Sequence, residues 1–181
     1  MTSQEFVEKL LDTLNYKTVY MWGTFGAPVT PKIIEEKAAQ YPAWYTKKVK
    51  EHLYRLIDKN YFAFDCAGLI KGILWGWKGD PTKPHGGARY KANGVPDLSA
   101  DGLIARCKPS TDFSNIVPGE LVWLSGHVGI YIGEGRVIEC TPAWQNGVQM
   151  TSCLNVEQEE SLDKGRLWLK HGKLPYIEDH G

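Results

Sequence analysis

Residues 62–77 read FAFDCAGLIKGILWGW, and this stretch decides the fold class of the chain around it. One aspartate and one lysine interrupt it, and it is too short to span a bilayer. Its apolar content predicts a buried helix over 66–77. Gly68, Gly72 and Gly76 recur along one side of that helix. Since each glycine costs a helix about 1 kcal/mol relative to alanine, we expect a strand or loop to pack closely against that side.

Further helices are expected before this stretch. A capping-box pattern that starts at Thr2 predicts a helix over about 3–14. Residues 20–28 are rich in glycine and aromatic residues and are interpreted as a loop. Residues 30–60 have a helical apolar stripe with a charged opposite side, and Pro42 divides it.

Loops and then strands are expected after it. Residues 78–118 carry many glycines and prolines, which predicts loops with one short helix over 99–107. From Glu120 the apolar period changes to two. Helices followed by an antiparallel sheet define the α+β class. The predicted strands are 121–124, 128–132, 137–140, 148–151 and 167–169.

Composition limits the classes of protein that are possible but does not indicate a function. The chain has 181 residues, of which 43% are apolar, so we expect one domain over 1–181. Lys plus Arg is 21 and Asp plus Glu is 21, and this zero net charge argues against a general nucleic-acid binder. No basic segment followed by an apolar run opens the chain, so we expect no secretory signal. The protein would then be made in the cytoplasm and reach another compartment only by a route that the sequence does not encode.

Cys66 is the first candidate for chemistry. It would lie at the start of the buried helix, where the helix dipole and free N–H groups favour a thiolate. The alternative is that it is a small buried apolar residue. The other cysteines are Cys107, Cys140 and Cys153, and no C-x-x-C pair indicates a metal site. We expect neither metal nor cofactor, and the sequence does not predict whether the other three form a disulfide.

His127 is the candidate base. Residues 126–133 read GHVGIYIG, a strand on which His127, Gly129 and Tyr131 share one face. We expect that face to be open, with room for a neighbouring group beside the glycine. The alternative is a plain polar strand residue. The other candidates are less suited, because His52 and His180 are expected to face solvent and His85 lies in a loop.

Glu139 is the candidate for orienting the base. It stands in the apolar strand 137–140, where a charge is unusual. A three-residue turn at 133–135 would place Glu139 on the face of His127, whereas a two-residue turn would place Cys140 there. Glycines on both sides of Glu134 favour the three-residue turn. The alternative is a solvent-facing strand residue.

Together these motifs resemble the NlpC-type cysteine peptidases of bacterial cell walls, which have a circularly permuted papain-like fold. Residues 64–69, FDCAGL, match the family's F-D-C-[SA]-G-L motif, and 127–133 match H-[VI]-G-I-Y-[IL]-G in full. Residues 118–121, PGEL, look like the strand entry P-G-[DE]-L, and 20–23 are similar to Y-x-W-G. The resemblance implies a papain-like fold with a helical insertion at about 27–62.

The resemblance also implies roles. Cys66 would be the nucleophile, His127 the general base and later the acid, and Glu139 the residue that orients the imidazole. The family usually has His, Asn or Gln at this last position, so the carboxylate is a departure. The residues expected to bind the oxyanion or the substrate are Tyr20, Asp65, Trp22 and Trp144.

The function that the resemblance implies is hydrolysis of peptidoglycan. The expected reaction cleaves an amide bond of the stem peptide between D-glutamate and a diamino acid. Residues 139–148 and 170–176 look like segments of phage and gut-bacterial members, which fits a phage or prophage lysin. We expect a monomer whose partner is the stem peptide, with no nucleic acid and no integral membrane contact.

Three alternatives stay open. One is an N-acetylmuramoyl-L-alanine amidase in the same fold. Another is a catalytically silent module that binds the cell wall, which the departure at Glu139 motivates. A zinc hydrolase has no supporting ligand spacing.

Overall fold

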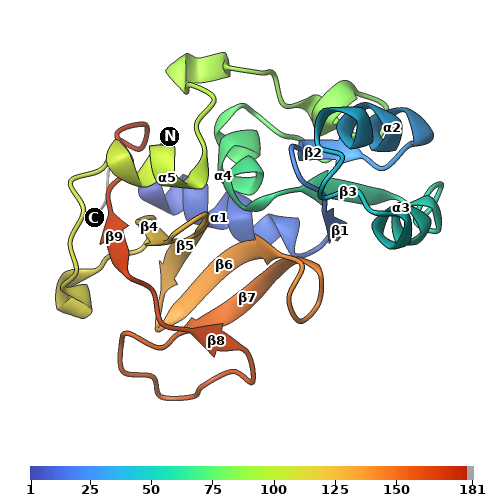
Figure 1. Cartoon of the computed structure of the whole chain (residues 1–181). Helices are drawn as coiled ribbons and strands as arrows, with labels where there is room; N and C mark the ends of the chain where they lie inside the picture. Colours follow the sequence, from blue (N-terminus) through green and yellow to red (C-terminus); the bar gives the residue numbers. More distant parts are fainter. Residues whose placement is uncertain (179–181) are drawn as a thin grey trace.

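The structure is a computed structural model that describes residues 1–178 and contains two sheets joined by a buried helix (Figure 1). That helix, α4 (Cys66–Leu74), packs against the larger sheet on one side and the smaller sheet on the other. The α+β class expected from the sequence is therefore observed. Within the described residues, no helix has both the length and the apolar character that crossing a membrane requires.

The helices lie close to where the sequence predicts them. Side chains of Thr2, Thr30, Thr46 and Ser99 cap four of them, each by accepting a backbone N–H of the first turn. The helix predicted to reach residue 77 ends at Leu74 instead. The other helices are α1 (Ser3–Thr13), α2 (Pro31–Gln40), α3 (Lys47–Tyr54), α5 (Ala100–Ala105), η1 (Pro84–Gly87), η2 (Ala92–Gly94) and η3 (Phe113–Asn115).

A small three-stranded sheet was not predicted. Its strands are β1 (Lys17–Tyr20), β2 (Phe25–Pro28) and β3 (Tyr61–Phe64), in the order β1-β3-β2. The interpretation of 20–28 as a loop is thus wrong for β2 and for the end of β1. Each strand has four residues, and β1 and β2 both pair with β3, about forty residues away in sequence. No local hairpin pattern therefore predicts them.

The larger sheet has six strands in the order β8-β7-β6-β5-β4-β9. Its central four strands are antiparallel, and each includes the residues predicted for it. The strands are β4 (Leu121–Leu124), β5 (His127–Gly133), β6 (Arg136–Thr141), β7 (Gly147–Cys153), β8 (Gly165–Arg166) and β9 (Lys170–Gly172).

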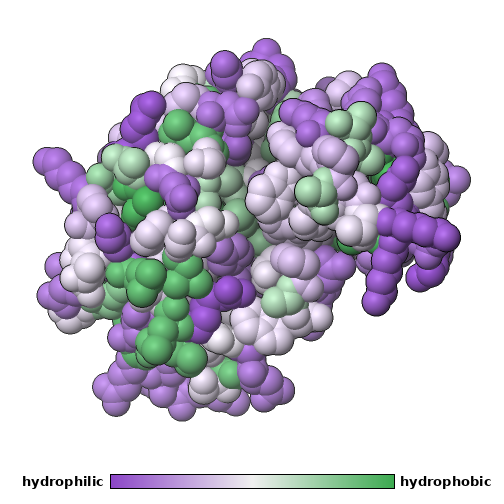
Figure 2. All heavy atoms as spheres, viewed as in Figure 1, coloured by the Kyte–Doolittle hydropathy of each residue, from purple (hydrophilic) through white to green (hydrophobic). Residues whose placement is uncertain are grey.

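Residues 167–169 are not a strand, which corrects the prediction. They join β8 at one edge of the sheet to β9 at the other edge. A flat six-stranded sheet would place its edges ~24 Å apart, but four residue steps span at most ~14 Å, so the sheet must be curled. Leu167 and Leu169 are exposed on this segment, while Trp168 is buried. Figure 2 shows a hydrophobic patch at the lower left of the molecule.

The segment between β8 and β9 covers the face of the larger sheet that was expected to be open. Trp168 packs with Tyr131, Val122 and Val137 over the inner face of the sheet. The expectation of an open face beside His127 is therefore wrong, because the segment between β8 and β9 crosses it.

Two glycines of α4 allow β2 and the residues before it to approach closely. A Cβ added at Gly68 would lie 1.9 Å from the carbonyl oxygen of Thr24, and one at Gly72 would lie 2.5 Å from that of Phe25. The predicted close packing is thus confirmed for these two. Gly76 lies beyond the helix with a φ of +91°, which corrects its place in the pattern.

Candidate active site

Asp65 fixes the start of α4. Its Oδ1 accepts the N–H of Gly68 at 2.6 Å, which caps the helix. Its Oδ2 accepts the N–H of Gly23 at 2.8 Å, from the segment between β1 and β2. The carboxylate therefore joins the segment that follows Tyr20 to the helix that begins with Cys66. Burial raises the pKa of Asp65 despite these two bonds.

Cys66 is buried at the first position of α4, with 7% of its surface exposed. Its thiol lies 3.8 Å from the carbonyl oxygen of Gly126, to which it can donate. Burial raises the pKa of the Cys66 thiol to about 11, and the nearby charge of Asp65 adds to this, although backbone N–H groups such as that of Val128 oppose it. The backbone N–H groups at the helix start thus favour the thiolate as expected, but burial and the charge of Asp65 outweigh them.

Tyr20 lies beside the cysteine. Its side chain forms a hydrogen bond with Cys66, and burial together with the neighbouring groups raises the pKa of its hydroxyl. The hydroxyl therefore keeps its proton and is available as a donor. Trp44 from the helical segment between β2 and β3 packs on the Tyr20 ring, with centroids 5.7 Å apart.

The hairpin of β5 and β6 places His127 and Glu139 on one face. Ile130 pairs with Ile138, and a register shift follows Tyr131. The turn itself has two residues, Glu134 and Gly135, both with positive φ. The three-residue turn is therefore wrong, but the register shift supplies the extra residue and leads to the predicted face.

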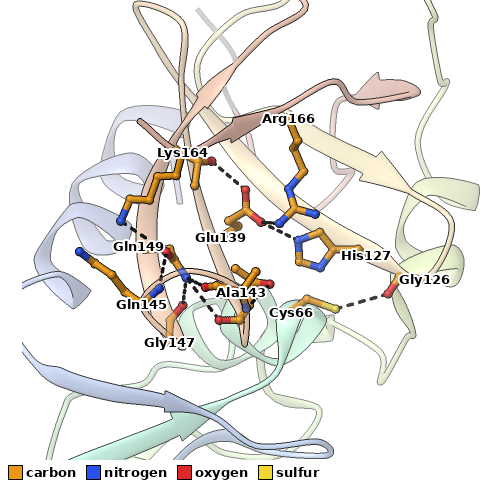
Figure 3. A network of polar contacts seen from close by, with 12 residues as sticks. Cys66, Gly126, His127, Glu139, Ala143, Gln145, Gly147, Gln149, Lys164 and Arg166 are labelled. Atoms are coloured by element: carbon orange, nitrogen blue, oxygen red, sulfur yellow. Dashed lines mark hydrogen bonds and ion pairs between the residues drawn. The ribbon is translucent and has the colours of Figure 1, made fainter. Parts of the chain in front are cut away.

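The imidazole of His127 contacts the carboxylate of Glu139 and turns its other edge towards the cysteine. Its Nε2 lies 2.8 Å from Oε1 of Glu139. In Figure 3 the other ring nitrogen, Nδ1, lies on the side of the Cys66 sulfur. A neutral imidazole that donates Nε2–H to the carboxylate presents an Nδ1 lone pair, which is what a base for the thiol requires.

Four further residues support this arrangement and were missed from the sequence. Glu139 is fully buried and also accepts from Arg166 Nη2 at 2.8 Å and from Thr151 Oγ1 at 2.7 Å. The Trp168 ring stacks on His127, with centroids 5.5 Å apart and planes 14° apart. Arg166 and Trp168 are two residues apart, so the spacing alone could have placed them on one face.

The fourth missed residue is Asp101 of α5. Its Oδ1 accepts the N–H of Gly126 and the indole N–H of Trp123, each at 2.9 Å. Gly126 has a φ of +74° and directly precedes His127. Asp101 therefore holds the turn that aims the histidine.

A groove of about 710 Å³ leads to the cysteine. Tyr20, Trp22, Asp65 and Cys66 line it, as do residues at the end of α2. Trp22 is 45% exposed. Trp144, which was also expected to bind substrate, is not part of the groove lining and instead covers the guanidinium of Arg166, 4.8 Å from its ring centroid.

A second cysteine–histidine–glutamate cluster lacks a free base. His171 is buried with Nδ1 3.1 Å from Glu120 Oε1 and Nε2 2.6 Å from the carbonyl oxygen of Asp112. Cys107 lies near Glu120, and burial with that charge raises its thiol pKa to about 12. Because both nitrogens of His171 are occupied, this cluster is suited to packing rather than to proton transfer.

The remaining histidines are not bonded to the cysteine. His52 is exposed on α3, whereas His85 of η1 lines the groove and its ring stacks on that of Phe25 in β2. His180 lies outside the described residues. All four cysteines are described and none forms a disulfide. Over residues 1–178, no three His, Cys, Asp or Glu side chains gather as a metal site would need.

No family model and no curated protein sequence matches the chain. Among solved structures it is similar to the P60 domain of an antigen from M. avium subspecies paratuberculosis. That match has a TM-score of 0.49 and 15% identity, and covers 97% of this chain and 98% of the other. It is also similar to NlpC2 from Trichomonas vaginalis, with a TM-score of 0.46 and 15% identity over 92% of this chain and 46% of that one.

Proposed function

We propose that this protein is a thiol-dependent peptidoglycan hydrolase that cleaves an amide bond of the stem peptide. One observation carries the proposal. The thiol of Cys66 lines a groove, the second ring nitrogen of His127 lies on the side of that sulfur, and the carboxylate of Glu139 is bonded to the first. This order is the one that nucleophilic catalysis by a cysteine needs.

The chemistry would proceed by acyl transfer. Nδ1 of His127 takes the thiol proton as the sulfur of Cys66 attacks the amide carbon. The imidazolium then gives that proton to the leaving amine as the carbon–nitrogen bond breaks. Water, deprotonated by the same imidazole, hydrolyses the resulting thioester and restores the thiol. Glu139 keeps the imidazole oriented through both halves of the reaction.

Two donors suit the oxyanion of this reaction. The backbone N–H of Cys66 is at the start of α4, where no earlier turn of the helix occupies it. The Tyr20 hydroxyl lies beside the sulfur and stays protonated. Donors fixed before the reaction begins lower its barrier most effectively, because they need no reorganisation.

The groove lining supports a polar peptide substrate. Lys37 lines it, as do Lys71 and Asp97, which form an ion pair with each other. A stem peptide offers both carboxylates and an amine, and the resemblance to NlpC-type peptidases favours the bond between D-glutamate and a diamino acid. We propose action on the bacterial wall as a monomer, in a lysin or a related role.

Two other functions need the same test. An N-acetylmuramoyl-L-alanine amidase would use the same residues on a different bond. A silent wall-binding module is favoured by the raised pKa of the Cys66 thiol, which leaves little thiolate in the free protein at neutral pH.

The test is digestion of sacculi of several peptidoglycan types, with the products identified by mass spectrometry. Fragments split after D-glutamate support the endopeptidase. Fragments freed from the glycan at the first alanine support the amidase instead. Binding without any released fragment would establish the silent module.

A further inference from the structure

Glu139 is a buried carboxylate with a cation in direct contact. None of its surface is exposed, and its Oε1 receives both His127 Nε2 and Arg166 Nη2, each at 2.8 Å. Figure 3 shows the imidazole and the guanidinium reaching the same carboxylate from two strands, β5 and β8. Thr151 on β7 supplies a third, uncharged donor.

Arg166 is held in place by aromatic rings. Its guanidinium lies 4.8 Å from the ring centroid of Trp144 and 5.5 Å from that of Trp168. Trp168 in turn stacks on the His127 ring. The cation, the two indoles and the imidazole thus form one packed unit above the carboxylate. A guanidinium is suited to this, because it stacks on rings and donates in its plane.

The charge of this unit matters for the base. A carboxylate in contact with an imidazole and shielded from water stabilises the imidazolium. An imidazole that stays protonated cannot accept the thiol proton. With a guanidinium on the same oxygen, the pair of Glu139 and Arg166 carries no net charge. The carboxylate then keeps its hydrogen bond to Nε2 while its field at the ring is largely cancelled.

The other ionisable groups around this unit are few. Lys164, two residues before Arg166, interacts with Glu139 through space and reaches Gln149. Cys140 follows Glu139 on β6, and Cys66 with Asp65 approaches from α4. Asp101 of α5 contacts the turn at Gly126. None of these is bonded to the Glu139 oxygens, so Arg166 is the group whose removal changes the balance most.

We propose that Arg166 is a positioning residue for the catalytic histidine, whose guanidinium cancels the charge of Glu139 so that the carboxylate orients His127 without holding it protonated. The inference rests on the proposed role of His127 as the base. It also accounts for a carboxylate at a position where the NlpC-type family usually has a neutral or basic side chain.

The test is an NMR titration of the His127 ring in the full chain and its variants. In Arg166→Met the carboxylate is left uncompensated, and the titration midpoint is expected to rise by about one pH unit. In Glu139→Gln the guanidinium is left alone, and the midpoint is expected to fall by a similar amount. In the double variant both charges are gone, and the midpoint returns to within a few tenths of a unit of the wild type.

Arg166→Lys is the matched control, because it keeps the charge and is expected to leave the midpoint nearly unchanged. Arg166→Gln replaces Arg166→Met if the latter does not fold, since it keeps a donor but removes the charge. A folded charge-removing variant with an unchanged midpoint overturns the proposal, as do single variants that shift in the same direction. The titration needs no substrate, so its failure is distinct from a failure to release fragments from sacculi.

Discussion

At the scale of single residues, the Cys66 thiol is held in its neutral form. Burial and the charge of Asp65 raise its pKa to about 11, so at pH 7 nearly all of it is protonated. The proposed reaction therefore depends on transfer of the proton to His127 at the moment of attack. For the same reason, slow alkylation of the free protein does not distinguish an active enzyme from a silent module.

Replacing Asp65 with Asn tests the electrostatic part of this shift. Asn keeps the cap of α4, while removal of the negative charge lowers the pKa of Cys66 towards its ordinary value. Below the pKa, the thiolate fraction grows tenfold for each unit by which the pKa falls. Alkylation by iodoacetamide at pH 8 is thus expected to be roughly threefold faster or more, followed by intact-protein mass.

Cys66→Ala serves as the control that assigns the alkylated residue. An equal or slower rate in Asp65→Asn would show that burial alone sets the pKa of the thiol. The Asn oxygen can still accept the N–H of Gly68, but the Asn NH2 cannot accept that of Gly23, so the temperature of thermal unfolding is expected to fall modestly and is measured beside the wild type.

The residues of the site differ in how far the sequence revealed them. Cys66, His127 and Glu139 stand in local patterns, a helix start and two paired strands, so period and turn geometry place them. Arg166 and Trp168 belong to a segment whose path depends on the curl of the whole sheet. The sequence shows that the two residues lie two positions apart, but it does not show which face of the sheet they cover. Asp101 accepts the backbone N–H of Gly126, which lies in another part of the sequence, and no periodic pattern predicts a contact of this kind.

At the scale of elements, the contact between α4 and the segment that enters β2 positions Cys66, the proposed nucleophile. Gly68 lies so close to the carbonyl of Thr24 that a methyl group has no room. The same segment carries the Gly23 N–H that Asp65 accepts. Any separation of the two elements therefore moves Cys66 relative to Tyr20.

Gly68→Ala is expected to destabilise the fold by about 1–3 kcal/mol, because backbone must shift to admit the added carbon. It should also lower the rate of cleavage by moving the start of α4. Thermal unfolding and the release of fragments measure the two effects. Gly102→Ala in α5 is the control, because its nearest contacts would be side-chain atoms at 3.3 Å. Equal stability of the two variants would contradict the close approach.

The elements themselves were predictable where their pattern is local. Helices α1 to α5 and strands β4 to β7 follow caps and periods that lie within a few residues. Strands β1, β2 and β3 are too short for a period and pair across forty residues, so only the folded chain defines them. Residues 165–172 form two strands, β8 and β9, at opposite edges of the larger sheet. These strands too are defined by the folded chain and not by a local pattern.

At the scale of the whole molecule, the zero net charge bears on how the protein finds its substrate. Twenty-one basic and twenty-one acidic residues leave no bulk attraction to an anionic wall. Binding would then rely on the shape of the groove and on exposed rings such as Trp22. Interactions of this kind are screened little by salt.

Binding of the Cys66→Ala variant to sacculi is therefore expected to change less than about threefold between 50 and 300 mM salt, since no large charge is neutralised. Co-sedimentation measures it. Adding Trp22→Ala should weaken binding several-fold, whereas adding Trp144→Ala, equally exposed but outside the groove lining, should have a much smaller effect. A steep loss of binding with salt would indicate an electrostatic mode instead.

The central claim is that Cys66 performs the cleavage, and the rate of peptide release from sacculi tests it most directly. Wild type and Cys66→Ala are measured side by side, with Cys107→Ala as a control that removes a buried thiol outside the site. We predict release by the wild type and the control, and a loss of at least ~10³-fold in Cys66→Ala with its fold intact. Release by Cys66→Ala at the wild-type rate would contradict the account.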